Sequence, residues 1–116
     1  MSRQTGTWGE AEVAGWLRKH GYELLAHSYH CRFGEIDLIA RKKGVISFVE
    51  VKLRSSVQYG LPREAVNARK QEKLRKTALC YLSEHELDCP VRFDVAEVYV
   101  DAAGEKPRIE YLENAF

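Results

Sequence analysis

The sequence lacks the features of an exported or membrane-spanning protein. Across its 116 residues, no apolar run approaches the ~20 residues that cross a bilayer. The first residues, MSRQTGTWGEAEV, contain no hydrophobic stretch resembling a secretory signal. These absences predict a cytoplasmic protein.

Cysteine is also scarce. Cys31, Cys80 and Cys89 are odd in number and show no C-x-x-C spacing, which favours reduced thiols over a disulfide framework or a zinc ribbon. His27 and His30 lie near Cys31 in the chain, but in a strand the two imidazoles would point to opposite faces. A zinc site there would need ligands from elsewhere, so we do not expect one.

Internal repeats and low-complexity linkers are absent as well. Apolar residues make up 45% and charged residues 30% of the chain, which argues against disorder. A chain of this length can build one modest core and is too short for two. We therefore expect a single domain over residues 1–116.

The small net charge of +1 conceals an asymmetry. Residues 1–83 carry 15 Lys and Arg against 8 Asp and Glu, whereas residues 84–116 carry 3 against 9. Such polarity suggests a face prepared for a polyanion. Two halves that neutralise each other across the fold would give the same totals, so charge alone does not decide.

Two segments carry helix signals. Thr7 can serve as an N-cap with Glu10 completing a capping box, and Gly21 is a plausible stop. Residues from about 63 to 85 form a longer helix in this interpretation, because one side repeats at helical spacing. That side comprises Val66, Lys70, Leu74, Ala78, Tyr81 and Leu82.

Strand patterns occupy most of the remaining chain. We expect an irregular strand over 22–32, a hairpin over 34–54 with RKKG at its turn, and a strand over VRFDVAEVYV, with RIEYLE as a further strand. SSVQYGLPRE, rich in Ser, Gly and Pro, is a loop. The order α-β-β-β-α-β predicts a mixed sheet flanked by helices, an α/β fold.

Three ionisable residues stand among apolar positions of the hairpin: Asp37, Glu50 and Lys52. If Arg41 pairs with Gly44, Asp37 lies opposite Phe48 and diagonal to Glu50, and both carboxylates project from one face. A one-residue slip would separate them. Strict alternation also places Ile36 and Leu38 together on the other face of the strand.

Two carboxylates, with water and phosphate oxygens, form the oxygen-rich environment that Mg²⁺ prefers. The Val51 carbonyl is a further candidate ligand. Lys52 lies one pleat beyond Glu50, from where it can orient or deprotonate a water or stabilise a charged phosphorane. The alternative is an ordinary cross-strand ion pair, since an E-x-K sequence often occurs on strands by chance. The whole pattern favours the metal-site interpretation.

Glu10 and Lys70 each allow two interpretations. Glu10 shares the apolar face of its helix and can support the metal, or it is only the capping-box partner of Thr7. Lys70 lies between inward-facing apolar positions and can bring a positive charge to a phosphate, or it extends out of the core as an amphipathic lysine.

Further basic residues can follow a phosphate backbone, although a solvated helix face is an equally good interpretation of any single one. These residues are Arg41, Lys42, Lys43, Arg54, Arg63, Arg69, Lys73 and Lys76. Trp8, Trp16 and Tyr59 can stack on bases, but packing is the safer expectation. Asp94 in RFDV is expected to pair with a nearby arginine rather than with metal.

Asp37 and the Glu50-Val51-Lys52 run resemble the PD-(D/E)XK nuclease superfamily, whose restriction-endonuclease-like fold has an αβββαβ core, with Ile36 where the motif has proline. More closely, TWGEAEVAGWL, GEIDLIA, FVEVKLR and RFDV resemble, in order, the YraN family of small endonuclease-like proteins. The resemblance implies Asp37 and Glu50 as metal ligands, Lys52 as the catalytic lysine, and Glu10 as the helix carboxylate of junction-resolvase-like members.

The sequence therefore predicts a Mg²⁺- or Mn²⁺-dependent endonuclease acting on nucleic acid, with DNA, including branched or damaged DNA, as the expected substrate. The rival hypothesis is a nucleic-acid-binding or scaffolding module that keeps the fold without turnover. A metal-binding structural protein is a third option. A homodimer or an unidentified protein partner is compatible with each hypothesis, and the sequence does not choose among these assemblies.

Overall fold

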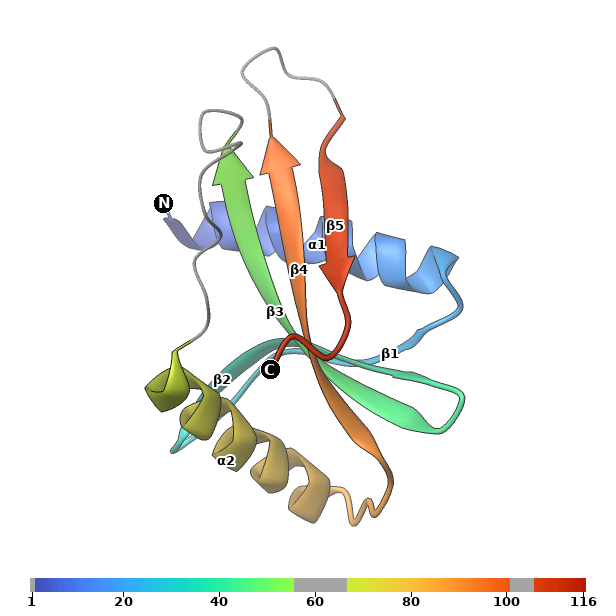
Figure 1. Ribbon diagram of the computed structural model, residues 1–116, viewed down its shortest axis with the longest axis vertical. Helices are drawn as coiled ribbons and strands as arrows, with labels where there is room; N and C mark the ends of the chain where they lie inside the picture. The colour runs from blue at the N-terminus through green and yellow to red at the C-terminus, as the bar shows by residue number, and fades with distance from the viewer. Residues whose placement is uncertain (1, 56–66, 101–105) are drawn as a thin grey trace.

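The computed structural model describes residues 2–55, 67–100 and 106–116. Within these ranges the chain forms two helices and a five-stranded sheet (Figure 1). The elements are α1 (Ser2–Lys19), β1 (Glu23–Cys31), β2 (Gly34–Lys42), β3 (Val45–Ser55), α2 (Ala68–Glu84), β4 (Val91–Val100) and β5 (Arg108–Leu112). Neither helix is long and apolar enough to cross a membrane in the part of the chain that is described.

The sheet has the strand order β1-β2-β3-β4-β5. β3 and β4 pair in parallel, and the other neighbouring strands pair in antiparallel fashion. The parallel pair requires a crossover, and α2 lies within that connection. The architecture is the expected αβββαβ core with β5 added at one edge, so the predicted α/β fold is confirmed.

Each helix covers a different face of this twisted sheet (Figure 1). The buried residues on the α1 side are Val13, Leu17, Tyr22, Leu38, Ala40, Val49, Ala96 and Val98. Those on the α2 side are Ile36, Ile39, Ile46, Phe48, Leu74, Ala78 and Tyr81. Central strands are thus covered on both faces, which explains their nearly continuous apolar sequences.

The first helix starts earlier than its capping signal predicts. It begins at Ser2, so Thr7 lies inside the helix and the predicted capping box is wrong. The predicted stop is confirmed, because Gly21 has φ +87° and its N–H donates to the Arg18 carbonyl. The Tyr22 N–H donates to the Leu17 carbonyl, which completes a Schellman motif.

The second helix begins at Ala68 rather than near residue 63. Asn67 is its N-cap, with an extended backbone and a side-chain oxygen that accepts a 2.8 Å hydrogen bond from the Lys70 N–H. Residues 63–66, including Val66 of the predicted inner side, lie outside the described residues. Farther along, Leu74, Ala78 and Tyr81 are buried as expected.

The β2–β3 turn sets the register of the candidate site. Lys43 and Gly44 both have positive φ, 53° and 79°, as a type I′ turn requires. Lys42 therefore pairs with Val45, two residues away from the expected register, in which Arg41 paired with Gly44. A shift of two preserves the face of every side chain within the paired residues. Asp37 and Glu50 lie just beyond the last of these pairs, Leu38 with Val49.

Strict alternation fails near Asp37. Leu38 packs in the α1-side core, whereas Ile36 packs with Ile39 on the α2 side, so the predicted common face for Ile36 and Leu38 is wrong. β1 is also irregular here, because Ser28, between the pairs His27–Leu38 and Tyr29–Ile36, has φ +50°. The local distortion explains the lost periodicity.

Candidate functional site

Asp37 and Glu50 lie near each other on the central hairpin. The β2–β3 ladder is paired as far as Leu38 with Val49, the residues next to Asp37 and Glu50, and the negative charge of Glu50 acts on the Asp37 carboxyl. The Val51 N–H donates a 2.7 Å hydrogen bond to Oδ2 of Asp37. The Asp37 carboxylate is thus fixed against β3, directly beside the position of Glu50.

The environment of Asp37 disfavours its negative charge. Burial, followed by the negative charge of Glu50, raises the pKa of Asp37 to about 7, although the Val51 hydrogen bond acts in the opposite direction. Glu10 and Glu35 add smaller contributions that also raise it. Several acidic groups therefore act on one partly buried carboxyl, and a bound cation would relieve their repulsion.

Glu10 reaches the same region from α1. Its Oε1 accepts a 3.0 Å hydrogen bond from the Ser28 hydroxyl. Ser28 of β1 lies beside Asp37 of β2, because the residues on either side of them are paired. With the helix starting at Ser2, the capping-box interpretation of Glu10 no longer applies. The strained φ of Ser28 lies at this contact, and such strain often accompanies functional sites.

Lys70 contacts the candidate ligand Glu50. Its Nζ lies 2.5 Å from Oε2 of Glu50, whose side chain is only 12% exposed, whereas that of Lys70 is 46% exposed. The ammonium group is therefore paired with Glu50, while the side chain of Lys70 remains partly exposed. The structure places a positive charge from α2 beside the pair.

Lys52 follows Glu50 on β3 and is half-buried. It pairs in the parallel ladder with Glu97 of β4. The Glu97 carboxylate, 2% exposed, accepts a hydrogen bond from Arg54 at 3.3 Å and another from the Tyr99 hydroxyl. The charge of Arg54 is thus engaged within the fold, whereas Lys52 has no ion pair with another described residue.

The predicted phosphate-tracking residues fall into two separate groups. Arg69 and Lys73 are exposed on α2, the helix that carries Lys70. Lys42 and Lys43 lie at the β2–β3 turn, on the opposite side of the molecule from the start of α2 (Figure 1). Lys42 Nζ lies 5.1 Å from the centre of the Tyr22 ring. The structure therefore does not bring these two groups onto one compact surface.

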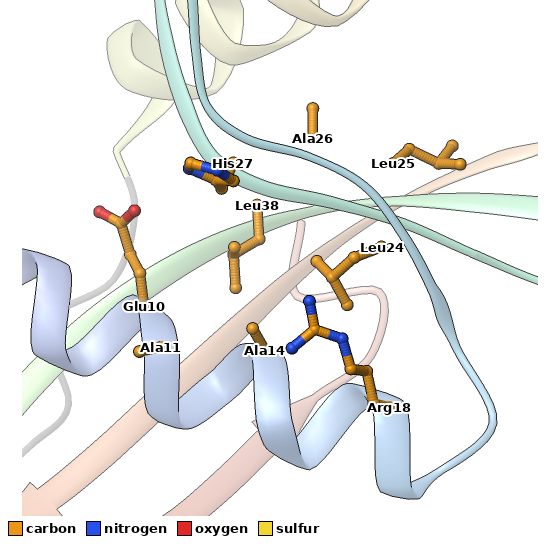
Figure 2. A pocket seen from close by; sticks show the side chains of 9 residues that line it. All are labelled: Glu10, Ala11, Ala14, Arg18, Leu24, Leu25, Ala26, His27 and Leu38. Atoms are coloured by element: carbon orange, nitrogen blue, oxygen red, sulfur yellow. The ribbon is translucent and has the colours of Figure 1, made fainter.

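A cavity of about 410 Å³ opens between α1 and β1 beside this site (Figure 2). Its lining residues are Glu10, Ala11, Ala14, Arg18, Leu24, Leu25, Ala26, His27 and Leu38. Figure 2 shows Glu10 and Arg18 extending from α1 toward the strands, with apolar side chains between them. The sequence did not reveal this cavity, because it depends on how α1 packs against β1.

Other candidates from the sequence have packing partners. Asp94 is fully buried and its Oδ1 lies 2.9 Å from Nε of Arg92, as predicted. Trp16 stacks between His20 and Tyr111. Trp8 remains 40% exposed, and Tyr59 and Arg63 lie outside the described residues. Throughout the described ranges, no three His, Cys, Asp or Glu side chains gather in a typical metal-binding arrangement.

Comparison with known proteins places the chain among relatives of closely similar length. The model of "Uncharacterised protein family UPF0102" matches residues 9–98. A UPF0102 protein of Acetivibrio thermocellus is 48% identical, covering 98% of this chain and 92% of the relative. UPF0102 proteins of Alkaliphilus metalliredigens and Syntrophomonas wolfei are 44% and 43% identical, with both chains of each pair covered completely. The chain therefore belongs to the UPF0102 family.

Proposed function

We propose that this protein is a Mg²⁺- or Mn²⁺-dependent endonuclease that hydrolyses phosphodiester bonds in DNA. Asp37 and Glu50 bind the metal, Lys52 assists attack by water, and Glu10 supports the metal from α1. Val51 contributes its carbonyl oxygen to the metal. The hairpin sequence resembles the PD-(D/E)XK superfamily, and the proposal applies that resemblance to the whole site.

The observation that carries the proposal is the placement of Asp37. Its carboxylate is held by the Val51 N–H at 2.7 Å, and the pKa is raised by burial and by Glu50. Acidic groups that repel one another at a partly buried position destabilise a fold unless a cation or a proton offsets them. A divalent cation is the species that would turn this arrangement into a binding site.

The donor set suits Mg²⁺ in particular. This ion is commonly held by one or two carboxylates and completes its octahedral shell with waters and phosphate oxygens, so a third acidic ligand is not required. When bound, it polarises a phosphoryl oxygen, lowers the pKa of an attacking water and neutralises the leaving oxygen.

The chain's own cations have complementary tasks in this proposal. Lys52, which is not ion-paired with any described residue, orients the water or stabilises the phosphorane. Lys70 neutralises Glu50, and its ammonium group would contact a substrate phosphate instead if Glu50 held a metal. Arg69 and Lys73, exposed on the same helix, hold the adjoining backbone.

A nucleic-acid-binding module without turnover is the second candidate. The Lys70–Glu50 ion pair favours this second candidate, because a lysine of the protein itself already neutralises one of the two carboxylates. In that case Asp37 and Glu50 would shape a basic surface instead of binding a metal. Binding to nucleic acid would then be salt-sensitive and independent of divalent ions.

The test uses the purified full chain with linear, single-stranded, flapped and four-way-junction DNA, and with RNA, in Mg²⁺, Mn²⁺ or EDTA. Asp37→Ala, Glu50→Ala and Lys52→Ala are compared with Glu72→Gln, which changes an exposed carboxylate on α2. Circular dichroism checks the folding of each variant. Calorimetry measures Mn²⁺ binding separately from cleavage.

Metal-dependent cleavage that all three site variants lose, and that Glu72→Gln keeps, would support the nuclease. Salt-sensitive binding without cleavage in any divalent ion would support the binding module. Unchanged Mn²⁺ affinity in both folded carboxylate variants would overturn the ligand assignment, whatever the activity.

A further inference from the structure

The cavity between α1 and β1 combines an aliphatic lining with charged groups at its edge. Ala14 of α1 and Leu24 and Leu38 of the strands supply apolar surface, and Figure 2 shows Ala14 and Leu38 between the side chains of Glu10 and Arg18. The volume of about 410 Å³ lies within the range of pockets that bind small molecules and cofactors. A suitable occupant therefore has a compact apolar body and polar groups along its edge.

Arg18 brings an uncompensated positive charge to this cavity. Its side chain extends from α1 toward the strands (Figure 2) and is exposed. Among the described residues, none forms a hydrogen bond or an ion pair with the Arg18 guanidinium. A guanidinium presents paired N–H donors in one plane, which match two neighbouring acceptors such as O6 and N7 of guanine.

The cavity adjoins the candidate metal site. Glu10 lines the cavity and also contributes to the negative charge that acts on Asp37. Leu38 lines it as well and directly follows Asp37 in β2. A molecule in the cavity would therefore lie next to the carboxylate that we assign to the metal.

The strand that borders the cavity is irregular. The register of β1 against β2 shifts between Leu24 and Ala26, and the next residue, His27, is exposed while it lines the cavity. β1 is an edge strand of the sheet. Such irregularities are common at sheet edges and beside active sites, where they change the direction of side chains.

We propose that this cavity binds one unpaired nucleobase of the substrate, next to the phosphate that the candidate site hydrolyses. The inference rests on the proposed function and names its substrate class: DNA with an unpaired nucleotide, as in a bulge, a flap or a single strand. The aliphatic side chains contact the faces of the base, and Arg18 donates to acceptors on its edge. A base within a regular duplex must first leave its stack, which makes intact duplex the poorer substrate.

The test measures DNA binding by fluorescence anisotropy in EDTA, so that metal-dependent cleavage does not contribute. Two labelled duplexes each carry a single-nucleotide bulge, which is guanine in one and an abasic residue in the other. The backbone and its charge are the same in both. We expect the wild type to bind the guanine bulge about ten-fold more tightly than the abasic bulge, and more tightly than an adenine bulge, which offers a donor in place of O6.

Two substitutions fill the cavity from α1. Ala14→Leu changes a half-buried position and Ala11→Leu an exposed one, where folding is less at risk. Each should lower the affinity for the guanine bulge to that for the abasic bulge. Gly15→Leu is the matched control, because a Cβ added there has no neighbour within 4 Å and Gly15 does not line the cavity. Arg18→Met should remove the preference for guanine over adenine, whereas Lys19→Met, at the exposed residue beside it, should keep it.

Equal affinity of the wild type for the guanine and abasic bulges would overturn the base site, while the nuclease proposal would stand or fall on the separate cleavage assay. A preference that persists in both filled variants, folded by circular dichroism, would also overturn it. Failure to bind either duplex would do the same, and calorimetric binding of guanosine monophosphate would then assign the cavity to a free nucleotide. A base preference without metal-dependent cleavage would support the base site in a binding module and overturn the nuclease.

Discussion

The Val51 main-chain N–H donates a 2.7 Å hydrogen bond to Oδ2 of Asp37. This bond anchors the Asp37 carboxyl, whose pKa is raised to about 7, to the strand that carries Glu50 and Lys52. It stabilises the charged form of Asp37, yet burial and neighbouring acidic groups outweigh it. The Asp37 carboxylate is therefore held in position, but its surroundings disfavour its negative charge. The first two predictions follow from this unfavourable charge.

Asp37→Asn should stabilise the protein at pH 8 in EDTA, by roughly 1–2 kcal/mol. In the folded state the pKa is raised to about 7, so the folded protein binds more protons than the unfolded chain between about pH 4 and pH 7. Stability consequently falls as pH rises through this window, and the variant lacks that loss. Urea unfolding at pH 4 and pH 8 measures it, with the exposed Asp88→Asn as control. Equal destabilisation at both pH values would count against the charge argument.

Mn²⁺ affinity should increase about ten-fold between pH 6 and pH 8, because the metal competes with a proton on Asp37. At the lower pH most Asp37 carboxyls are protonated, given a pKa of about 7. Calorimetry in buffers of different ionisation enthalpy should detect release of up to about one proton per ion bound at pH 6. A pH-independent affinity would show that Asp37 does not bind the ion.

Lys70→Met should raise Mn²⁺ affinity several-fold and weaken DNA binding. The Lys70 ammonium occupies Oε2 of Glu50, so its removal frees a ligand while taking a cation from the face of α2 that would hold phosphate. Lys73→Met, an exposed lysine on the same helix, should weaken DNA binding without changing metal affinity. Calorimetry and fluorescence anisotropy separate these effects. A lower Mn²⁺ affinity in Lys70→Met would mean that Lys70 orients Glu50 for the metal and does not compete with it.

Asp94→Ala should destabilise the fold by about 3–5 kcal/mol, because it removes the buried carboxylate that lies closest to the Arg92 guanidinium and leaves that mostly buried charge with weaker compensation. Asp94 is fully buried and accepts hydrogen bonds from Arg92, the Tyr111 hydroxyl and the Asn114 N–H. Urea unfolding measures the loss. Glu113→Gln, which changes an exposed partner 3.7 Å from Arg92, should cost far less. Equal losses in the two variants would contradict the central role of Asp94.

The order of elements and the apolar faces could be predicted from the sequence, because they depend on local periodicity and on glycine signals such as Gly21. The proximity of Asp37 and Glu50 was predicted even though the register was wrong by two residues. The side-chain period of a strand is two, so an even error changes the face of no side chain in the regular part of the ladder.

Contacts that depend on how the elements pack could not be predicted in this way. The Ser28–Glu10 hydrogen bond needs α1 to lie across β1, and the close approach of Gly34 to Thr77 needs the β1–β2 turn to meet α2. Ile36 does not follow the strict alternation of β2, and the neighbouring strand β1 is irregular at Ser28, which has a positive φ. The sequence also could not show that Lys42 lies on the opposite side of the molecule from the start of α2 (Figure 1).

The parallel pairing of β3 with β4 has a consequence for folding kinetics. Ile46 pairs with Val91 across a connection that includes the whole of α2, so this ladder must overcome a larger loop-closure entropy than the β2–β3 hairpin. The hairpin that carries Asp37 and Glu50 is local, and we expect it to form before β4 docks. Early folding intermediates would then bring the two carboxylates together while the edge of β3 is still unpaired, and divalent ions would accelerate the docking step if they bind at that stage.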